Sequence, residues 1–302
     1  MKSFIRAVEY WVPSNDRSIL EFGGGLYGNA ARFEAVSRGL CFGRGEGLPG
    51  QAWEAGHPIV LKQFEGSYFR RIAAARAEGI TCGIAVPIFA GDFLTSVMVI
   101  FCGDDEQHAG AIELWSNDPD ASHDLTLVDG YYGTTGDTFE FISRSTAFRL
   151  GNGLPGMAWE QQAPVFLEDL GTGSGFLRAN SAVKVGINRG FAVPCSSSGR
   201  SNYVMAFLSA LATQIARRVE IWRPDAAHEQ LLRSSGFCEL EGALGPLADG
   251  VARGEGPIGL AFLTGVPAVA AGVGDSGERE MGVAAIPVIH QGRLRAVLAL
   301  HL

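Results

Sequence analysis

One short pattern occurs three times along this chain of 302 residues. It reads Gly-Leu-Pro-Gly at 47–50 and 153–156, and Gly-Pro-Ile-Gly at 256–259. An alanine and an aromatic residue follow each copy, with Trp53, Trp159 and Phe262 as the aromatic residues. A repeat of this kind means that each copy must be compared with the other two before any single residue is interpreted.

The flanking segments repeat as well. A strand-like run ends at Trp11, Trp115 and Trp222, and these tryptophans are 104 and 107 residues apart (115 − 11 and 222 − 115). A period near 100 residues is too long for a solenoid unit and suits a small domain with its own core. We therefore expect three domains, at 1–105, 106–212 and 213–302.

Composition narrows the class of protein. Apolar residues make up 47% of the chain, charged residues 19%, and the net charge is −8. A nucleic-acid-binding protein would show a concentrated basic face, which this sequence lacks. No apolar run reaches the length needed to cross a membrane, and no secretory signal stands at the N-terminus.

Cysteine and histidine spacing gives no framework for a disulfide or a metal site. The five cysteines are odd in number and none falls in a C-x-x-C pair, while the six histidines show no H-x-x-x-H spacing. We expect a reducing, cytoplasmic compartment and no metal centre.

Within the first copy, alternation of apolar residues predicts strands at 6–12 and 18–22, joined as a hairpin. Residues 33–41 are compatible with a short helix or a third strand, 50–56 with a short helix, and 57–61 with an extended segment. Helical spacing predicts the clearest helix at 67–78, with Ser67 as N-cap and Gly79 just beyond its end. A second hairpin is expected at 83–89 and 94–101.

The order of Gly-x-Gly-Leu-x-Gly, Ala-Trp, x-Pro-Val and a final Val-Pro-Ile hairpin, present three times, resembles the GAF family of small sensory domains. The resemblance implies an α/β (α+β) fold: three tandem GAF-like domains, each a mainly antiparallel sheet with short helices and reduced terminal helices. It also implies a module that binds a ligand or dimerises.

The sequence departs from that family in two ways. The first is the lack of room for the long terminal helices that cover the second face of the sheet. We therefore expect the copies to pack sheet against sheet, within the chain or across a homodimer. The second is a deletion. The closing glycine and the later proline are 37 and 38 residues apart in the first two copies but 28 in the third, where 272–277 replaces the helix. The third copy is therefore expected to lack a full pocket.

Eight residues are candidates for ligand binding: Trp53, Phe69, Arg70, Cys82, Trp159, Phe176, Arg178 and Cys195. The tryptophans could stack on a flat ligand or anchor a core. The arginines could pair with a carboxylate or phosphate, or lie on a solvated face. The cysteines flank the strand that lines the family's pocket, or act as small buried apolar residues.

The primary functional hypothesis is a non-catalytic sensory or regulatory protein. It would bind a small molecule or a protein partner and signal in trans, to its own second copy in a homodimer or to a separate output protein. No cofactor can be named. One alternative is a structural or dimerisation scaffold with no ligand. The other is a thiol-dependent enzyme similar to free methionine sulfoxide reductases, suggested by Cys41, Cys82 and Cys102.

Overall fold

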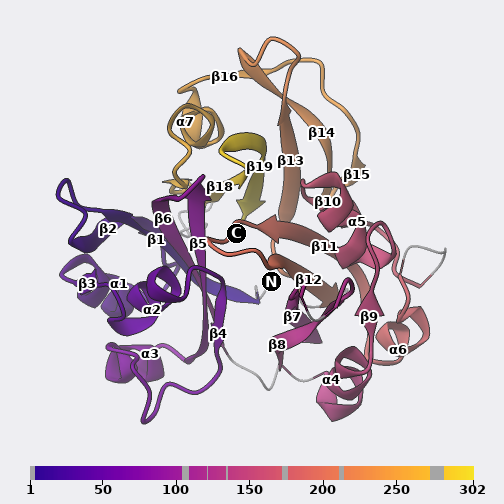
Figure 1. Cartoon of the computed structure of the whole chain (residues 1–302), viewed down its shortest axis with the longest axis horizontal. Helices are drawn as coiled ribbons and strands as arrows, with labels where there is room; N and C mark the ends of the chain where they lie inside the picture. Colours follow the sequence, from indigo (N-terminus) through magenta and orange to yellow (C-terminus); the bar gives the residue numbers. More distant parts are fainter. Residues whose placement is uncertain are drawn as a thin grey trace.

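The computed structural model describes residues 4–103, 109–120, 122–133, 135–171, 176–210, 214–272 and 282–302. It contains three antiparallel sheets (Figure 1). The first sheet comprises β1 (Ile5–Pro13), β2 (Ile19–Leu26), β3 (Cys41–Gly43), β4 (Ile59–Leu61), β5 (Ile80–Ala90) and β6 (Phe93–Gly103). The second comprises β7 (Ala109–Asn117), β8 (Leu125–Gly133), β9 (Ala147–Phe148), β10 (Val165–Leu167), β11 (Ile187–Cys195) and β12 (Asn202–Ala210). The third comprises β13 (Arg218–Pro224), β14 (Gln230–Cys238), β15 (Gly242–Leu244), β17 (Ala268–Ala270), β18 (Val283–His290) and β19 (Arg293–His301), with β16 (Val251–Ala252) paired to β14.

All three sheets have the same strand order. The first runs β3-β2-β1-β6-β5-β4, and the second and third follow the same path with β9-β8-β7-β12-β11-β10 and β15-β14-β13-β19-β18-β17. An opening hairpin and a closing hairpin therefore meet at the centre of each sheet, where Trp11 pairs with Val97, Trp115 with Val204, and Trp222 with Val297. The expected α+β fold with mainly antiparallel sheets is confirmed. The predicted domain borders, at 105/106 and 212/213, lie outside the described residues.

The described helices are short: α1 (Ala31–Arg38), α2 (Gly47–Ala55), α3 (Ile72–Ala77), α4 (Gly136–Arg144), α5 (Gly153–Gln161), α6 (Ala179–Lys184) and α7 (Gly256–Thr264). The repeated glycine pattern is thus the first turn of a helix, and the short helix expected at 50–56 begins three residues earlier, at Gly47. A side chain on Gly50 would overlap the carbonyl oxygen of Gly43, and Gly156 and Gly259 face the same obstacle. The closing glycine is required because the helix starts against the strand before it.

The predicted helix at 67–78 is shorter than expected, because only 72–77 is helical. The Ser67 hydroxyl donates to the carbonyl of Phe64 and accepts from the amide of Phe69. This local turn competes with helix formation, so Arg71 rather than Ser67 precedes the helix. Gly79 follows it with a φ of 66°, as predicted. In the third sheet, most of the 272–277 segment lies outside the described residues.

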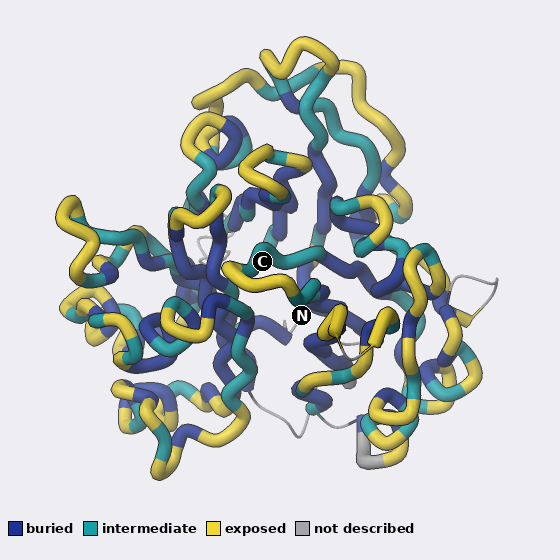
Figure 2. Tube along the Cα trace, viewed as in Figure 1, coloured by how far each residue is buried: buried dark blue, intermediate teal, exposed yellow. Residues whose placement is uncertain are grey.

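Each sheet buries both faces. One face carries α1–α3, α4–α6 or α7 and forms a core of its own. The other faces of all three sheets share a single apolar cluster at the centre of the molecule, which includes Ile84, Met205 and Leu298. Figure 2 shows the strands around this centre as largely buried, with most exposed segments at the periphery and one exposed segment crossing the middle of the view. Sheet-to-sheet packing within the chain therefore covers the faces that terminal helices would otherwise cover.

Candidate functional site

A glutamate stands two residues before the tryptophan in the central strand of every sheet. Glu9, Glu113 and Glu220 are 0%, 0% and 4% exposed, and each accepts a hydrogen bond from the indole nitrogen of its neighbouring tryptophan at 2.8, 3.1 and 3.1 Å. All three lie on the helix-bearing face. A buried carboxylate is costly without a positively charged partner. The partner of each glutamate therefore shows whether the space beside it is already occupied by the protein's own side chains.

In the first sheet the partner is Arg71, the residue that precedes α3. Its guanidinium makes a two-pronged contact with Glu9 at 2.6 and 2.7 Å, and both side chains are within 1% of full burial. Tyr27 donates its hydroxyl to the same carboxylate at 2.7 Å. Burial, then the nearby Glu9 charge, raises the pKa of Tyr27, so the phenol stays protonated as a donor.

The second sheet repeats this arrangement. Arg178 precedes α6 and contacts Glu113 at 2.6 and 2.7 Å, while Tyr132 and Ser143 donate to Glu113 at 3.1 and 2.8 Å. Burial, then the Glu113 charge, raises the pKa of Tyr132. The two sheets therefore carry matched buried ion pairs, which we call the Glu9–Arg71 and Glu113–Arg178 pairs.

Aromatic rings surround both guanidinium groups. The Arg71 guanidinium carbon lies 4.5–6.0 Å from the ring centroids of Trp11, Phe33, Phe42, Phe69 and Phe101. The Arg178 guanidinium carbon lies 5.0–5.7 Å from those of Trp115, Phe139, Phe148 and Phe176. Cation–π attraction adds to the ion pair in such a setting. The chain's own side chains thus fill the space between sheet and helices around these two glutamates.

The third sheet satisfies its glutamate differently. Glu220 accepts from Arg218 at 2.8 Å, Arg233 at 2.9 Å and His301 at 3.3 Å. All three partners come from strands, and the His301 side chain is 33% exposed. Burial pushes the pKa of Glu220 upward, but the hydrogen bonds from His301, Arg218 and Arg233 outweigh it and lower the pKa to about 2.

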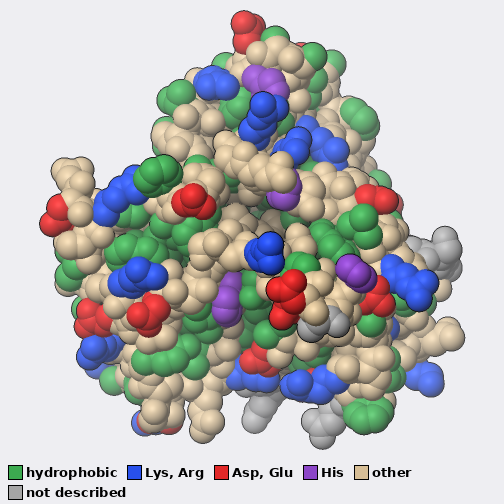
Figure 3. All heavy atoms as spheres, viewed as in Figure 1, with side chains coloured by type: hydrophobic (Ala, Val, Ile, Leu, Met, Phe, Trp, Pro, Cys, Tyr) green, Lys and Arg blue, Asp and Glu red, His purple; other side chains and the backbone are tan. Residues whose placement is uncertain are grey.

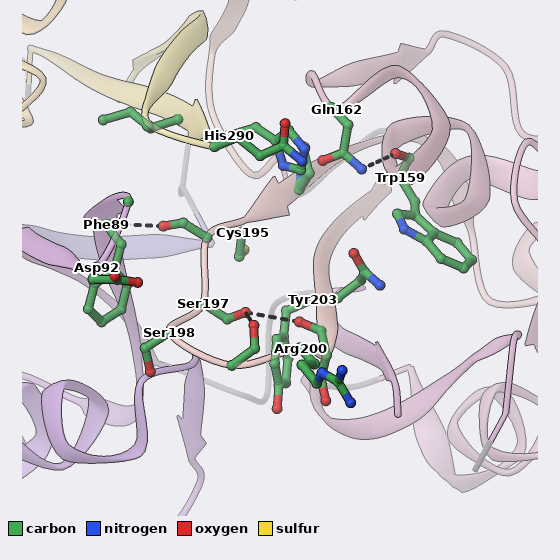
Figure 4. Close-up of a pocket in the computed structure, with 18 residues that line it drawn as sticks. Phe89, Asp92, Trp159, Gln162, Cys195, Ser197, Ser198, Arg200, Tyr203 and His290 are labelled. Atoms are coloured by element: carbon green, nitrogen blue, oxygen red, sulfur yellow. Dashed lines mark hydrogen bonds between the residues drawn. The ribbon is translucent and has the colours of Figure 1, made fainter. Parts of the chain in front are cut away.

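A cavity of about 350 Å³ lies where closing hairpins of the three sheets meet (Figure 4). We call it the junction pocket. The first sheet contributes Phe89, Gly91 and Asp92, the second contributes Trp159, Gln162 and residues 194–203, and the third contributes Ile289, His290 and Gln291. Figure 3 shows acidic, basic and histidine side chains around the centre of the molecule in this view. The volume is at the lower end of the range for small-molecule sites.

The connection between β11 and β12 shapes one wall of this pocket and fastens the second sheet to the first. The hydroxyl of Ser196 accepts from the amide of Phe89 at 2.8 Å and donates to the carbonyl of Pro87 at 3.3 Å. The amide of Ser198 donates to the carbonyl of Gly56, at the end of α2, at 3.0 Å. The pocket wall is therefore also an inter-sheet contact.

The pocket combines several chemical groups. Cys195 lies near the middle of the view in Figure 4, with Asp92 on the side of the first sheet and Trp159 on the opposite side. Burial raises the pKa of the Cys195 thiol to about 12 and outweighs a hydrogen bond from the backbone of Met205, so the group is a neutral thiol at pH 7. Burial, then the charge of Arg295, lowers the pKa of His290. A neutral imidazole can accept as well as donate a hydrogen bond.

The structure distributes the eight sequence candidates over five places. Trp159 and Cys195 line the junction pocket. Phe69, Phe176 and Arg178 lie in the buried aromatic clusters, and Trp53 is half-buried against the core of the first sheet. Cys82 lies in the central cluster. Arg70 is exposed and pairs with Glu46 at 2.8 Å.

Sequence reasoning missed Arg71 and the three glutamates. The sequence did contain a signal for the glutamates. In all three copies, a glutamate stands two residues before the tryptophan of an otherwise apolar strand. The junction pocket had no comparable signal, since its walls come from three different sheets that are far apart along the chain. Among the described residues, no group of three or more His, Cys, Asp or Glu side chains is arranged to hold a metal ion. No helix in the described ranges is long and apolar enough to span a membrane.

No protein-family model and no curated protein matches this chain. Solved structures do align with it. They include the A. aeolicus nlh2 GAF domain in an inactive state, with 23% identity over 34% of this chain and 61% of that one, at a TM-score of 0.27. They also include the free methionine-R-sulfoxide reductase of Neisseria meningitidis, with 20% identity over 33% and 51% and a TM-score of 0.25. A further GAF domain aligns with 17% identity over 33% and 51%, at a TM-score of 0.27. The aligned part of this chain spans between half and three-fifths of these three structures. What the chain is similar to, over about a third of its own length, is the GAF-like fold.

Proposed function

We propose that this chain is a non-catalytic regulatory protein that binds a small molecule in the junction pocket and signals to a separate partner protein. The observation that supports this proposal is the place of the pocket: its walls come from all three sheets. A ligand in the junction pocket would contact all three sheets at once. Binding could then favour one arrangement of the sheets over another, which is what a regulatory ligand must do.

The buried ion pairs support the choice of this pocket over the helix-bearing faces. Arg71 and Arg178 already occupy the space beside Glu9 and Glu113, and a ligand would have to displace a paired guanidinium from an aromatic surround. Displacing either would leave a buried charge without its partner. The junction pocket carries no such cost.

Tryptophan fluorescence tests the proposal with a matched control. Trp53 and Trp159 occupy equivalent helical positions, and only Trp159 lines the junction pocket. A library of small polar metabolites is first screened by thermal shift against the whole chain. A true ligand should then change the fluorescence of the wild-type protein and of Trp53→Phe, but not of Trp159→Phe. An equal response from both variants would place binding elsewhere.

Native mass spectrometry of freshly purified protein gives the complementary result. A small bound mass that is lost in Trp159→Arg, a substitution that replaces an aromatic ring of the pocket wall with a charged side chain, would support ligand binding. A bare chain in every preparation, with no thermal shift from any compound, would overturn the proposal. The same spectra report whether the chain forms the homodimer considered above.

A scaffold without a ligand is the second candidate, and the shared central cluster favours it. One apolar core formed by three sheets would hold a fixed shape on which a partner could assemble. The scaffold predicts that Trp159→Arg leaves partner binding unchanged, whereas the regulatory proposal predicts that it mimics or abolishes the ligand's effect.

The thiol enzyme receives less support from the geometry. Cys41 is exposed on β3, whereas Cys82 and Cys102 are buried in the central cluster, so the three do not gather at one cavity. Turnover of free methionine sulfoxide with a dithiol reductant, lost in Cys82→Ser, would restore that alternative.

A further inference from the structure

Two buried cysteines lie directly opposite each other on neighbouring strands. Cys82 on β5 pairs with Cys102 on β6 in the antiparallel ladder. Both side chains are 0% exposed, and both belong to the central cluster. They therefore project from the same face of the first sheet, into the core that all three sheets share.

This register meets the geometric requirement for a cross-strand disulfide. Directly opposed residues of an antiparallel pair have Cα atoms about 4.5 or 5.5 Å apart, depending on the ladder position. A disulfide requires Cα atoms roughly 4.4–6.8 Å apart. Either ladder position falls within that Cα range, so a local adjustment at the irregular end of the ladder is enough to bring the two sulfurs together.

We propose that Cys82 and Cys102 form a redox-active dithiol that a low-molecular-weight disulfide oxidises to an intramolecular disulfide. One cysteine thiolate attacks the small disulfide, forms a mixed disulfide and releases the first small thiol. The second cysteine thiolate then attacks the protein sulfur of that mixed disulfide and releases the second small thiol. The chain loses two electrons and two protons, and the small disulfide gains them as two thiols.

The pair lies near the end of its hairpin that is remote from the turn, where local opening would admit the reagent. The last rung of the ladder joins Ile80 to Gly103, and the register shifts between Ile80 and Cys82. Thr81, in that irregular step, is exposed. Opening the end of the ladder costs less than unfolding the domain, so exchange can proceed from a locally opened state.

The opposite end of the same hairpin carries Phe89 and Asp92 of the junction pocket. A disulfide at one end of the β5–β6 hairpin would therefore restrain the whole hairpin. The other end of that hairpin forms one wall of the junction pocket. The proposed dithiol does not depend on ligand binding in the junction pocket, because it is inferred only from the pairing of Cys82 with Cys102.

Peptide mapping of the intact, folded chain tests the proposal. Oxidised glutathione is added to the protein until the exposed Cys41 is fully glutathionylated, and the remaining thiols are then alkylated after denaturation. We expect a linked peptide joining Cys82 to Cys102, two hydrogens lighter than the separate peptides and reversed by dithiothreitol. Complete alkylation of both cysteines while Cys41 is modified would overturn the proposal.

Two variants serve as the check on specificity. Cys102→Ala should abolish the linked peptide, whereas Cys238→Ala should keep it, because Cys238 is also buried but faces Arg218 and Gly242 across its strands. Oxidised wild type should also unfold at a higher temperature than reduced wild type, by about 5 °C, and the shift should vanish in Cys102→Ala. A shift that persists in Cys102→Ala would assign it to another modification. Should Cys102→Ala fail to fold, the wild-type peptide map still decides the question.

Discussion

The first and third sheets place a glutamate at the same position of the same strand but neutralise it in different ways. Glu9 takes its cation from Arg71, 62 residues away and on the helix-bearing side of the first sheet. Glu220 takes its cations from Arg218 and Arg233, which are 2 and 13 residues away and lie on the sheet itself. The second sheet follows the first, with a separation of 65 residues between Glu113 and Arg178.

The difference shows what the helical segment contributes. In the first two sheets, the residue before α3 or α6 fastens that segment to the sheet through a buried ion pair. In the third sheet the strands supply the counter-charges, so the glutamate needs no such segment. The buried carboxylate is thus the common requirement, and the source of its partner is what varies.

The largest expected effect is that of Arg71→Ala, which leaves Glu9 buried without its cation. Removing one member of a buried pair costs about 3–5 kcal/mol. We expect a loss of that size in the free energy of unfolding, measured by urea denaturation. The matched control is Arg218→Ala, which leaves Glu220 with Arg233 and His301 and should cost about 1 kcal/mol. Equal losses would contradict the comparison.

The double variant Glu9→Leu, Arg71→Met sharpens the same point. Apolar residues of similar volume can replace a buried ion pair at little cost, so the double variant should be more stable than Arg71→Ala alone. If it is less stable, the hydrogen bonds from Trp11 and Tyr27 to Glu9, which the double variant also removes, outweigh the ion pair.

Gly50→Ala tests a feature that the sheets share. The new methyl group would overlap the carbonyl oxygen of Gly43, and Gly259→Ala would meet that of Ala252. Because both sites need the same backbone shift, we expect similar losses of about 1–3 kcal/mol in the two variants. A loss confined to one of them would show that the two helix starts are not equivalent. Thermal denaturation of the two proteins side by side gives the measurement.

The pH dependence of Glu220 is the next effect in size. Against the upward effect of burial, the hydrogen bonds from His301, Arg218 and Arg233 lower the pKa of Glu220 from its ordinary value of 4.5 to about 2, so the folded state binds fewer protons than the unfolded state between these values. The resulting stabilisation is fully present above about pH 5 and is lost as the pH falls toward 2, and it amounts to about 3 kcal/mol at most. Wild type and Glu220→Gln should differ in unfolding free energy at pH 6 and converge near pH 2. A constant difference across that range would exclude the carboxylate as its source.

His301→Ala should have the smallest effect. Its imidazole contacts Glu220 at 3.3 Å and is one-third exposed, so screening by solvent limits the interaction to about 1 kcal/mol or less. In chemical denaturation at pH 6, His301→Ala should lose less unfolding free energy than Arg218→Ala does. The reverse order would make the imidazole the principal partner of Glu220.

The sequence predicted the hairpins and the antiparallel sheets well, because period-2 alternation and turn residues are local signals. It predicted the helix at 67–78 less well, since the hydroxyl of Ser67 forms a local turn instead of capping a helix. The sequence pattern indicates Arg70 as a ligand-binding residue, whereas the structure buries Arg71 and leaves Arg70 exposed. With the helix beginning at Ile72, the second of two adjacent arginines points into the core and the first points to solvent.

The junction pocket could not have been predicted from local pattern. Its residues belong to connections that are adjacent only after the three sheets have packed on the central cluster. Trp159 and Cys195 were named for their positions relative to the glycine pattern and the closing hairpin, and those positions say nothing of contacts with another sheet. The burial that raises the pKa of Cys195 is likewise a property of the packed chain.

Because the three sheets belong to one chain, their sequences can differ, and the molecule need not be symmetric. Three identical chains packed around an axis would present the same loop three times at their meeting point. Here the turns at Gly91 and Gly292 are tight, while the second sheet alone carries the serine-rich connection from Cys195 to Asn202. A single chain can therefore place one distinct side chain at each corner of a central cavity. A ligand bound in the junction pocket, as proposed above, would therefore meet different side chains from each of the three sheets.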